Sequence, residues 1–220
     1  MTERIVIDQT GDILGLIDIQ PTFMPGGELP VPAGDEVVPV ANRLMKTAFV
    51  HCFATQDWHP PHHSSFASSH PGKAPYETVD MAYGQQVLWP DHAVQGSSGA
   101  ALHGSLDPSA IEMIVRKGFR REIDSYSAFF ENDRRTATGL AGYLRERGLR
   151  RLFLVGLATD YCVAYSAEDA AGLGFGVFVV EDGCRGISLS AGDGATSVDV
   201  ARKRLQEKGV RFISSTALRS

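Results

Sequence analysis

The sequence has little of what an exported, membrane-bound or nucleic-acid-binding protein needs. It contains no apolar run of about 18 residues and no signal-peptide core near its start, so we expect a cytoplasmic protein with no membrane partner. Its three cysteines are an odd number in a chain of 220 residues, which argues against a disulfide framework and for reduced thiols. The net charge is -5, without a stripe of Lys or Arg, so we expect no nucleic-acid partner.

The apolar residues are grouped in short runs. Hydrophobic residues make up 43% of the chain, and a chain of this length buries roughly 70% of its unfolded surface. Runs of strand length occur near residues 12–17, 47–54, 111–116, 151–157, 176–181 and 210–214. Helical patterns occur near 35–46, 132–147, 161–173 and 194–208. This alternation predicts one α/β domain over residues 1–220, with three layers: a doubly wound, mostly parallel six-stranded Rossmann-like sheet and helices on both faces.

Residues 58–109 are rich in His, Pro, Ser and Gly and have little periodicity. A loop region of this length is uncommon unless it is functional. We therefore expect this region to carry ligand contacts and short helices.

Four chemically able residues follow the predicted strands. Ligands of open parallel sheets bind outside the carboxyl ends of the strands, where the strand order reverses. Asp18 closes the first strand, Asp57 follows the second, Lys117 follows the third and Cys162 lies just beyond the fourth. We expect all four to share one edge of the sheet.

Cys162 is the candidate nucleophile. It would lie in the first turn of a helix, where free backbone N–H groups and the helix dipole favour a thiolate and can hold an oxyanion. Burial would raise the pKa of Asp18 and make it a usable base, and Lys117 could lower the pKa of the thiol. Read alone, Asp18 could equally cap a turn and Lys117 could be a solvated strand end. Cys52 and Cys184 are interpreted as structural cysteines.

A second cluster has the residue types of a metal site. Asp57 and His59 are two apart, so their side chains share one side of an extended chain. His92 could supply a third ligand and His63 a further one, leaving room for water or substrate. This donor set suits one divalent transition-metal ion, Zn, Fe or Mn. Surface imidazoles and helix caps are the alternative, and we assign that role to the other histidines: His51, His62, His70 and His103.

Six motifs in order resemble the nicotinamidase/pyrazinamidase branch of the isochorismatase-like cysteine hydrolases over nearly the whole chain. They are Ile17-Asp18-Ile19-Gln20 with Phe23 and Gly26-Gly27, Gln56-Asp57-Trp58-His59-Pro60, Leu88-Trp89-Pro90-Asp91-His92, Lys117-Gly118, Asp124-Ser125-Tyr126-Ser127-Ala128-Phe129, and Ala158-Thr159-Asp160-Tyr161-Cys162-Val163. The resemblance implies a triad of Asp18, Lys117 and Cys162, and metal ligands Asp57, His59 and His92, with His63 less certain. It also implies an aromatic pocket of Phe23, Trp89 and Tyr126, an oxyanion hole from the N–H groups of Ala158 and Cys162, and a cis peptide between Leu157 and Ala158.

The resemblance further implies hydrolysis of a small carboxamide, nicotinamide before pyrazinamide, through a thioester. Pro21-Thr22 departs from the family, because many relatives carry Asn-Asp before the Phe, and this puts the shape of the pocket in question. Other interpretations are a related hydrolase of another amide, a carbamoyl compound or a vinyl ether, a non-catalytic binding protein, and a hydrolase in which Cys162 is incidental to a metal-bound water. The sequence leaves a homo-oligomer open.

Overall fold

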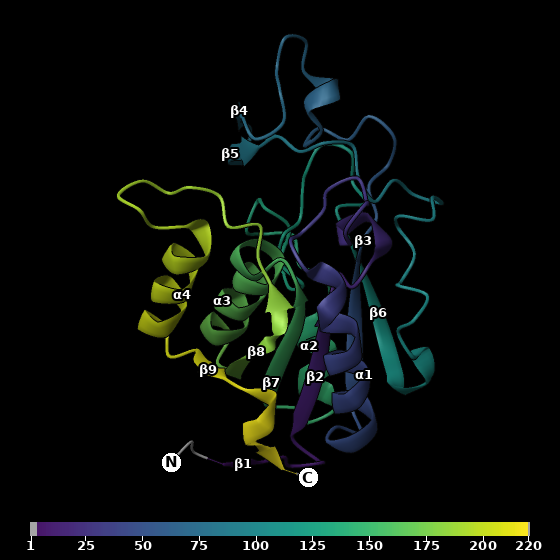
Figure 1. Ribbon diagram of the computed structural model, residues 1–220, viewed down its shortest axis with the longest axis vertical. Helices are drawn as coiled ribbons and strands as arrows, with labels where there is room; N and C mark the ends of the chain where they lie inside the picture. Colours follow the sequence, from purple (N-terminus) through teal and green to yellow (C-terminus); the bar gives the residue numbers. More distant parts are fainter. Residues whose placement is uncertain (1–3, 220) are drawn as a thin grey trace.

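The central element of the computed structural model, which describes residues 4–219, is a parallel six-stranded sheet (Figure 1). The spatial order of the strands is β6-β3-β2-β7-β8-β9. Their bounds are Asp12–Ile17 for β2, Cys52–Asp57 for β3, Ile111–Lys117 for β6, Arg151–Leu157 for β7, Gly176–Arg185 for β8 and Arg211–Ile213 for β9. The chain moves outward in one direction from β2 to β6 and in the other from β7 to β9. The order therefore reverses between β2 and β7, which confirms the doubly wound sheet.

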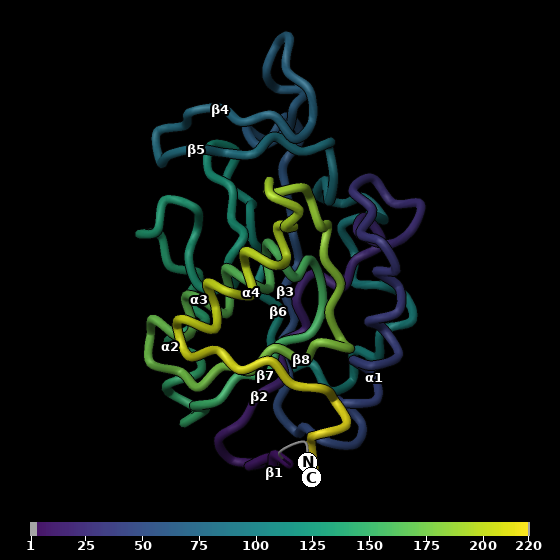
Figure 2. Tube along the Cα trace, turned by 60° about the vertical axis from the view of Figure 1, so that its left-hand side comes forward, coloured from purple at the N-terminus to yellow at the C-terminus, as the bar shows by residue number. Residues whose placement is uncertain are grey.

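Helices cover both faces of the sheet, which gives the three predicted layers (Figure 2). Helix α1, Val37–Thr47, packs on the face that carries Leu14 and Leu16 of β2. Helices α2, Leu140–Glu146, α3, Ala164–Gly172, and α4, Ser197–Glu207, pack on the face of Ile13 and Ile17. Because both faces are covered, every residue of β2 is buried and the strand reads as a continuous apolar run.

Two predicted elements are placed differently in the structure. The strand expected near 47–54 begins only at Cys52, because α1 continues to Thr47 and the following turn exposes 59% of Val50. The helix expected over 132–147 begins only at Leu140. Asp133 Oδ1 accepts the N–H groups of residues 135 and 136, and this side chain holds a turn in place of the first helical turns. Gly139 at φ 97° ends that turn.

The other predicted elements need smaller corrections. The helix expected from 161 begins as a π-helical turn, Thr159–Val163, before α3. Helix α4 starts at a capping box of Thr196 and Asp199. Strand β8 runs four residues beyond the expected end at 181, to Arg185. The short helices expected within 58–109 appear as 3₁₀ turns at Ala67–Ser69 and, at the end of the region, Pro108–Ala110. The sequence did not predict β1, Ile5–Val6, and β10, Leu218–Arg219, which pair in parallel, nor 3₁₀ turns at Pro21–Phe23, Gly34–Glu36 and Ser215–Ala217.

The region 58–109 extends over the carboxyl end of the sheet (Figure 1). Much of it is irregular, as predicted, but it contains an antiparallel hairpin of β4, Thr78–Met81, and β5, Gly84–Val87. This hairpin was not predicted, because each strand has only four residues and β5, with Gly84, Gln85 and Gln86, lacks an alternation of apolar and polar residues. None of the helices within residues 4–219 is long and apolar enough to cross a membrane.

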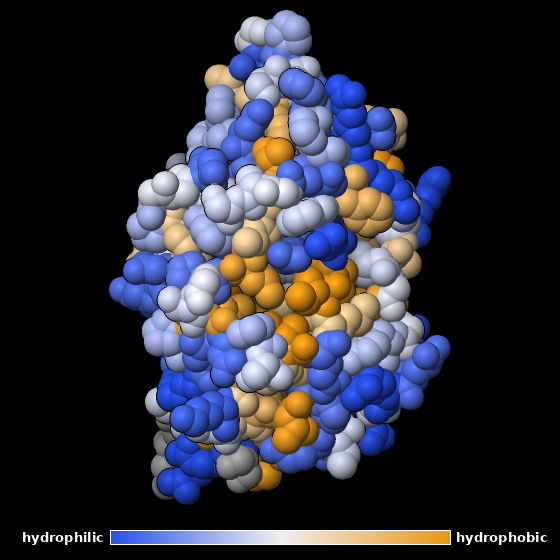
Figure 3. All heavy atoms as spheres, turned by 90° about the vertical axis from the view of Figure 1, so that its right-hand side faces the viewer, coloured by the Kyte–Doolittle hydropathy of each residue, from blue (hydrophilic) through white to orange (hydrophobic). Residues whose placement is uncertain are grey.

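Strands β2 and β7 approach very closely where the strand order reverses. A Cβ atom on Gly156, which lies at φ 119°, would come within 2.0 Å of the carbonyl oxygen of Ile17. Only glycine fits this contact. At the far edge of the sheet, no strand within residues 4–219 pairs with the outer side of β6, and Ile114 on it is 48% exposed. Apolar side chains are visible between charged groups on that side of the molecule (Figure 3).

Candidate functional site

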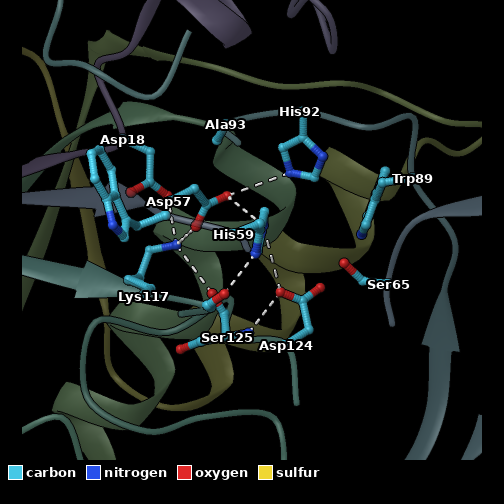
Figure 4. Close-up of polar contacts among 12 residues, drawn as sticks. Asp18, Asp57, His59, Ser65, Trp89, His92, Ala93, Lys117, Asp124 and Ser125 are labelled. Atoms are coloured by element: carbon cyan, nitrogen blue, oxygen red, sulfur yellow. Dashed lines mark hydrogen bonds and ion pairs between the residues drawn. The ribbon is translucent and has the colours of Figure 1, made fainter. Parts of the chain in front are cut away.

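The strand ends bring the four expected residues together, and Figure 4 shows three of them, Asp18, Asp57 and Lys117. Asp18 follows β2, Asp57 ends β3, Lys117 ends β6 and Cys162 lies beyond β7. Lys117 Nζ lies 2.9 Å from Asp18 Oδ2 and 3.7 Å from Cys162 Sγ, and it makes its closest contact with Asp57 Oδ1. The carboxylate, the ammonium and the thiol named as a triad from the sequence are therefore adjacent.

Asp18 has one carboxylate oxygen fixed and one without a hydrogen bond. Thr55 Oγ1 donates to Oδ1 at 2.5 Å, while Oδ2 forms an ion pair with Lys117 Nζ at 2.9 Å and is recorded with no hydrogen-bonding partner among residues 4–219. Burial raises the pKa of Asp18 to about 6, against the opposing effect of Lys117. The predicted rise is confirmed, and a carboxylate of this pKa can exchange protons near neutrality.

Lys117 is a buried cation between two carboxylates. Burial alone would lower the pKa of Lys117, but Asp18 and Asp57 outweigh it and raise that pKa well above the ordinary value. Burial alone would likewise raise the pKa of Asp57, yet Lys117 and the nearby imidazoles hold it well below the usual range. The two carboxylates differ because Lys117 Nζ is closer to Asp57. Asp57 is thus a permanent anion and Asp18 a titratable one.

Cys162 lies in the π-helical turn and is 6% exposed. Burial raises the pKa of its thiol well above the ordinary value; Lys117 lowers it, while Asp18 and Asp57 raise it further. Lys117 thus lowers the pKa of the thiol as expected, but the helix start and Lys117 do not leave that pKa below its ordinary value, because desolvation and two carboxylates outweigh one ammonium. The proton must instead leave as the sulfur reacts, and Asp18 is the neighbouring acceptor.

Asp57 also faces two histidines on its other side (Figure 4). Its Oδ2 lies 3.8 Å from His59 Nε2 and 3.7 Å from His92 Nε2. His59 Nδ1 lies 2.9 Å from Gly118 O, and His92 Nδ1 lies 2.8 Å from Pro90 O. A carbonyl can only accept, so each ring carries a proton on Nδ1, and Nε2 is the nitrogen that faces Asp57.

This donor set fits a transition-metal ion. The ligand atoms of Asp57, His59 and His92 all lie within 4.8 Å of one another. Burial lowers the pKa of His59 to about 4, so the ring is neutral, as a metal ligand must be. Two oriented imidazoles and one carboxylate are a common set for Zn and its neighbours.

His63 and Asp124 stand beside this group. His63 Nδ1 lies 2.7 Å from Ser65 Oγ and its Nε2 lies 2.8 Å from Arg120 O, so both ring nitrogens have protein partners. Asp124, 2% exposed, places Oδ1 3.9 Å from His59 Nε2. Sequence reasoning quoted Asp124 within a motif but gave it no role. Its position two residues before Tyr126 was the available signal.

A small cavity with a mostly apolar and aromatic lining opens beside Cys162. The aromatic residues expected there, Phe23, Trp89 and Tyr126, all line it. The rest of its lining is Leu29, Asp57, His92, Asp124, Ala158, Tyr161, Cys162 and Ile187. Sequence reasoning gave no role to Leu29, Tyr161 or Ile187, because nothing in their local patterns distinguishes them from core residues.

The backbone around the cavity has the expected features. The peptide between Leu157 and Ala158 is cis, and the N–H of Ala158 has no acceptor among residues 4–219. The departure at Pro21-Thr22 leaves Phe23 in the cavity, because Thr22 Oγ1 accepts the N–H of Ala93 at 3.1 Å and fixes the turn.

Asp160 is a further residue that sequence reasoning did not single out. This 5% exposed carboxylate accepts the N–H of Ile187 at 3.0 Å, the N–H of Ser188 at 2.9 Å and the hydroxyl of Ser197 at 2.5 Å. It thereby ties the segment after β8 to the turn that carries Cys162, and it holds Ile187 against the cavity.

The remaining histidines assigned to surface roles lie outside the cavity, and so do the other two cysteines. His51 pairs with Glu112 at 2.5 Å, and His70 Nε2 lies 2.7 Å from Ser64 O. Burial raises the pKa of both Cys52 and Cys184 to about 12. Their interpretation as unreactive thiols agrees with this environment.

Comparison with known proteins agrees with this geometry. A family model described as the isochorismatase domain matches residues 12–216. The nicotinamidase of Acinetobacter baylyi is 48% identical over 200 residues, covering 91% of each chain. A solved nicotinamidase/pyrazinamidase of Acinetobacter baumannii is 46% identical with a TM-score of 0.90, covering 94% of this chain and 97% of its own. The Pyrococcus horikoshii pyrazinamidase, solved in complex with zinc, is 30% identical with a TM-score of 0.71, covering 92% and 98%. The chain belongs to the isochorismatase domain family.

Proposed function

We propose that this chain is a nicotinamidase, which hydrolyses nicotinamide to nicotinate and ammonia through a thioester on Cys162. The observation that carries the proposal is the contact of Lys117 with both Asp18 and Cys162 at the base of a small aromatic cavity. The activities named for the Acinetobacter relatives support the same substrate. Pyrazinamide has the same size and carboxamide, and we expect it to be hydrolysed too.

Binding would place the pyridine ring among Phe23, Trp89 and Tyr126, with the carboxamide toward Cys162. These aromatic side chains supply flat apolar contacts and exclude water from the ring. The N–H groups of Ala158 and Cys162 would donate to the carbonyl oxygen, which gains negative charge as the sulfur attacks.

Asp18 would move each proton. As the Cys162 sulfur bonds to the carboxamide carbon, the thiol proton passes to Oδ2 of Asp18, the oxygen without a hydrogen bond. Asp18 then returns the proton to the amide nitrogen, the C–N bond breaks and ammonia leaves. Lys117, 3.7 Å from Sγ, would stabilise the sulfur while it carries negative charge.

The second half of the reaction would use the same base. Water attacks the thioester carbon while Asp18 accepts one of its protons, and the C–S bond breaks to release nicotinate. Asp18 then reprotonates Cys162, so that the protein returns to its starting state. The raised pKa of Asp18, about 6, suits a group that takes and returns a proton in each half.

Asp57, His59 and His92 would hold one divalent transition-metal ion, and zinc is the first candidate because the Pyrococcus horikoshii relative is solved with it. When bound, the ion would supply a Lewis acid that can take the pyridine nitrogen. His63, whose ring nitrogens both have protein partners, would remain outside this ligand set. Metal analysis of protein purified without chelator, with Zn, Fe and Mn as outcomes, tests the assignment.

Ammonia release by the purified protein tests the function. We expect release from nicotinamide and pyrazinamide and little from benzamide, which lacks a ring nitrogen. His92→Ala should raise the KM for nicotinamide and scarcely worsen benzamide. Activity on an N-carbamoyl compound or a vinyl ether without activity on nicotinamide would overturn the proposal. The cytoplasmic location remains a prediction, which cell fractionation would test.

A further inference from the structure

The β4–β5 hairpin buries one side chain against the segment 124–132, which carries Tyr126 of the cavity lining. Gln85 and Gln86 are neighbours on β5, but Gln85 is exposed whereas Gln86 is 1% exposed. A buried amide must find hydrogen-bonding partners, because leaving them unmade is costly. All the partners of Gln86 apart from its own neighbour Val87 belong to the hairpin turn or to the segment 124–132.

These partners determine which way the amide of Gln86 points. The N–H of Tyr126 donates to Asn132 Oδ1 at 3.0 Å, so the Asn132 amide nitrogen faces Gln86 Oε1, at 3.1 Å. The hydroxyl of Tyr83 donates to the same oxygen at 3.1 Å. Gln86 must therefore turn its NH₂ group toward Tyr126. Its two hydrogens have three acceptors, of which Val87 O and the Tyr126 hydroxyl oxygen, each at 2.7 Å, are nearer than Asp124 Oδ2 at 3.0 Å.

The Tyr126 oxygen receives a second N–H group. Trp89 Nε1 donates to it at 3.0 Å, in addition to Gln86. A phenol oxygen has two lone pairs and one hydrogen, and both lone pairs are engaged. No residue within 4–219 accepts the Tyr126 O–H hydrogen, and Tyr126 lines the cavity beside Cys162. The hydrogen is thus left for a bound ligand.

We propose that Gln86 is a positioning residue, which acts from the β4–β5 hairpin through Tyr126, and that the Tyr126 hydroxyl donates a hydrogen bond to the carboxamide oxygen of the bound ligand, beside the N–H groups of Ala158 and Cys162. The inference rests on the proposed function, because it takes nicotinamide as the ligand. It gives the hairpin, which lies outside the sheet and carries no reacting group, a part in substrate affinity.

Four proteins test the proposal: wild type, Gln86→Met, Tyr126→Phe and the double variant. Methionine matches glutamine in length but lacks the NH₂ donor and the carbonyl acceptor of the amide. We expect each single variant to raise the KM for nicotinamide roughly three- to tenfold with kcat little changed, the size of one hydrogen bond. Because Gln86 acts through the Tyr126 hydroxyl, the double variant should be no worse than the poorer single variant. Gln85→Met is the matched control and should behave like wild type.

Calorimetric binding of nicotinate gives a readout independent of turnover, and its Kd should rise with the KM. Circular dichroism checks that each variant is folded. Multiplicative effects in the double variant, or Gln86→Met values equal to those of Gln85→Met, would overturn the proposal. Should Gln86→Met fail to fold, an unchanged KM and nicotinate Kd in Tyr126→Phe would overturn it, and a rise in both would support it.

A failure of the proposed function can be told apart from a failure of the role of Gln86, because it would be seen in the wild-type protein. If wild type releases no ammonia from nicotinamide but hydrolyses another amide, the substrate assignment is lost, and the same variants compared on that amide decide the role of Gln86.

Discussion

Lys117→Met removes the ammonium from the centre of the site while keeping nearly the same side-chain length. The Lys117 side chain is fully buried, and it contacts Asp18, which is equally buried, and Asp57, whose side chain is 7% exposed. Removing one partner of a buried ion pair leaves uncompensated charge and costs about 3–5 kcal/mol of unfolding free energy. For a chain of this size that corresponds to a fall in Tm of roughly 6–20 °C. Ammonia release should also be lost, because nothing then stabilises the Cys162 sulfur as it becomes negative.

The stability loss and the activity loss can be separated. In the double variant Lys117→Met with Asp18→Asn, one of the two uncompensated carboxylates is gone, so part of the Tm should return while ammonia release stays absent. The matched control is Lys203→Met on the exposed face of α4, where a surface change costs less than about 0.5 kcal/mol. Thermal and urea unfolding of the four proteins provide the measurement. A Lys117→Met variant as stable as Lys203→Met, or a double variant no more stable than the single, would refute the buried-charge reasoning.

Three further predictions follow from the site. Cys162→Ala should abolish ammonia release with little loss of stability, whereas Cys184→Ala should retain most of the ammonia release. An equal loss of ammonia release in the two variants would mean that the nucleophile is misassigned. Because the pKa of Asp18 is raised to about 6 and its ionised form is the base, kcat/KM should fall as pH drops through about 6, and a pH profile flat from 5 to 8 would contradict this. Removal of metal by a chelator should lower activity, Zn should restore it, and His92→Ala should bind less metal by elemental analysis, whereas a metal-free protein of full activity would exclude the metal assignment.

The sequence predicted the parts of the site that follow directly from strand ends. Asp18, Asp57, Lys117 and Cys162 each stand at or just past the carboxyl end of a parallel strand, and the register of such a sheet places these ends on one edge. The apolar runs of β2 and β7 needed no correction, because both strands are buried on both faces. The fold and the meeting of the triad could be argued from these runs alone.

Features that depend on the sum of several environments could not be predicted. The pKa of Cys162 reflects burial, one ammonium and two carboxylates together, and the sequence gives the groups but not their distances. The inward turn of Gln86 is decided by Asn132 and Tyr83, which lie on separate segments, and no periodicity reports it. The late start of α2 has the same origin, since the side chain of Asp133 competes locally with a helical pattern.

The close backbone contact between β2 and β7, where the strand order reverses, sets the positions of two reacting groups. Gly156 meets the carbonyl of Ile17, one residue before Asp18, and it lies two residues before the proposed oxyanion donor Ala158. Any side chain at 156 would push β2 and β7 apart. It would thereby displace both Asp18 and the turn that carries Cys162, although neither residue would itself be altered. A deep mutational scan should therefore find position 156 as intolerant as the triad, at a residue with no side chain to offer the reaction.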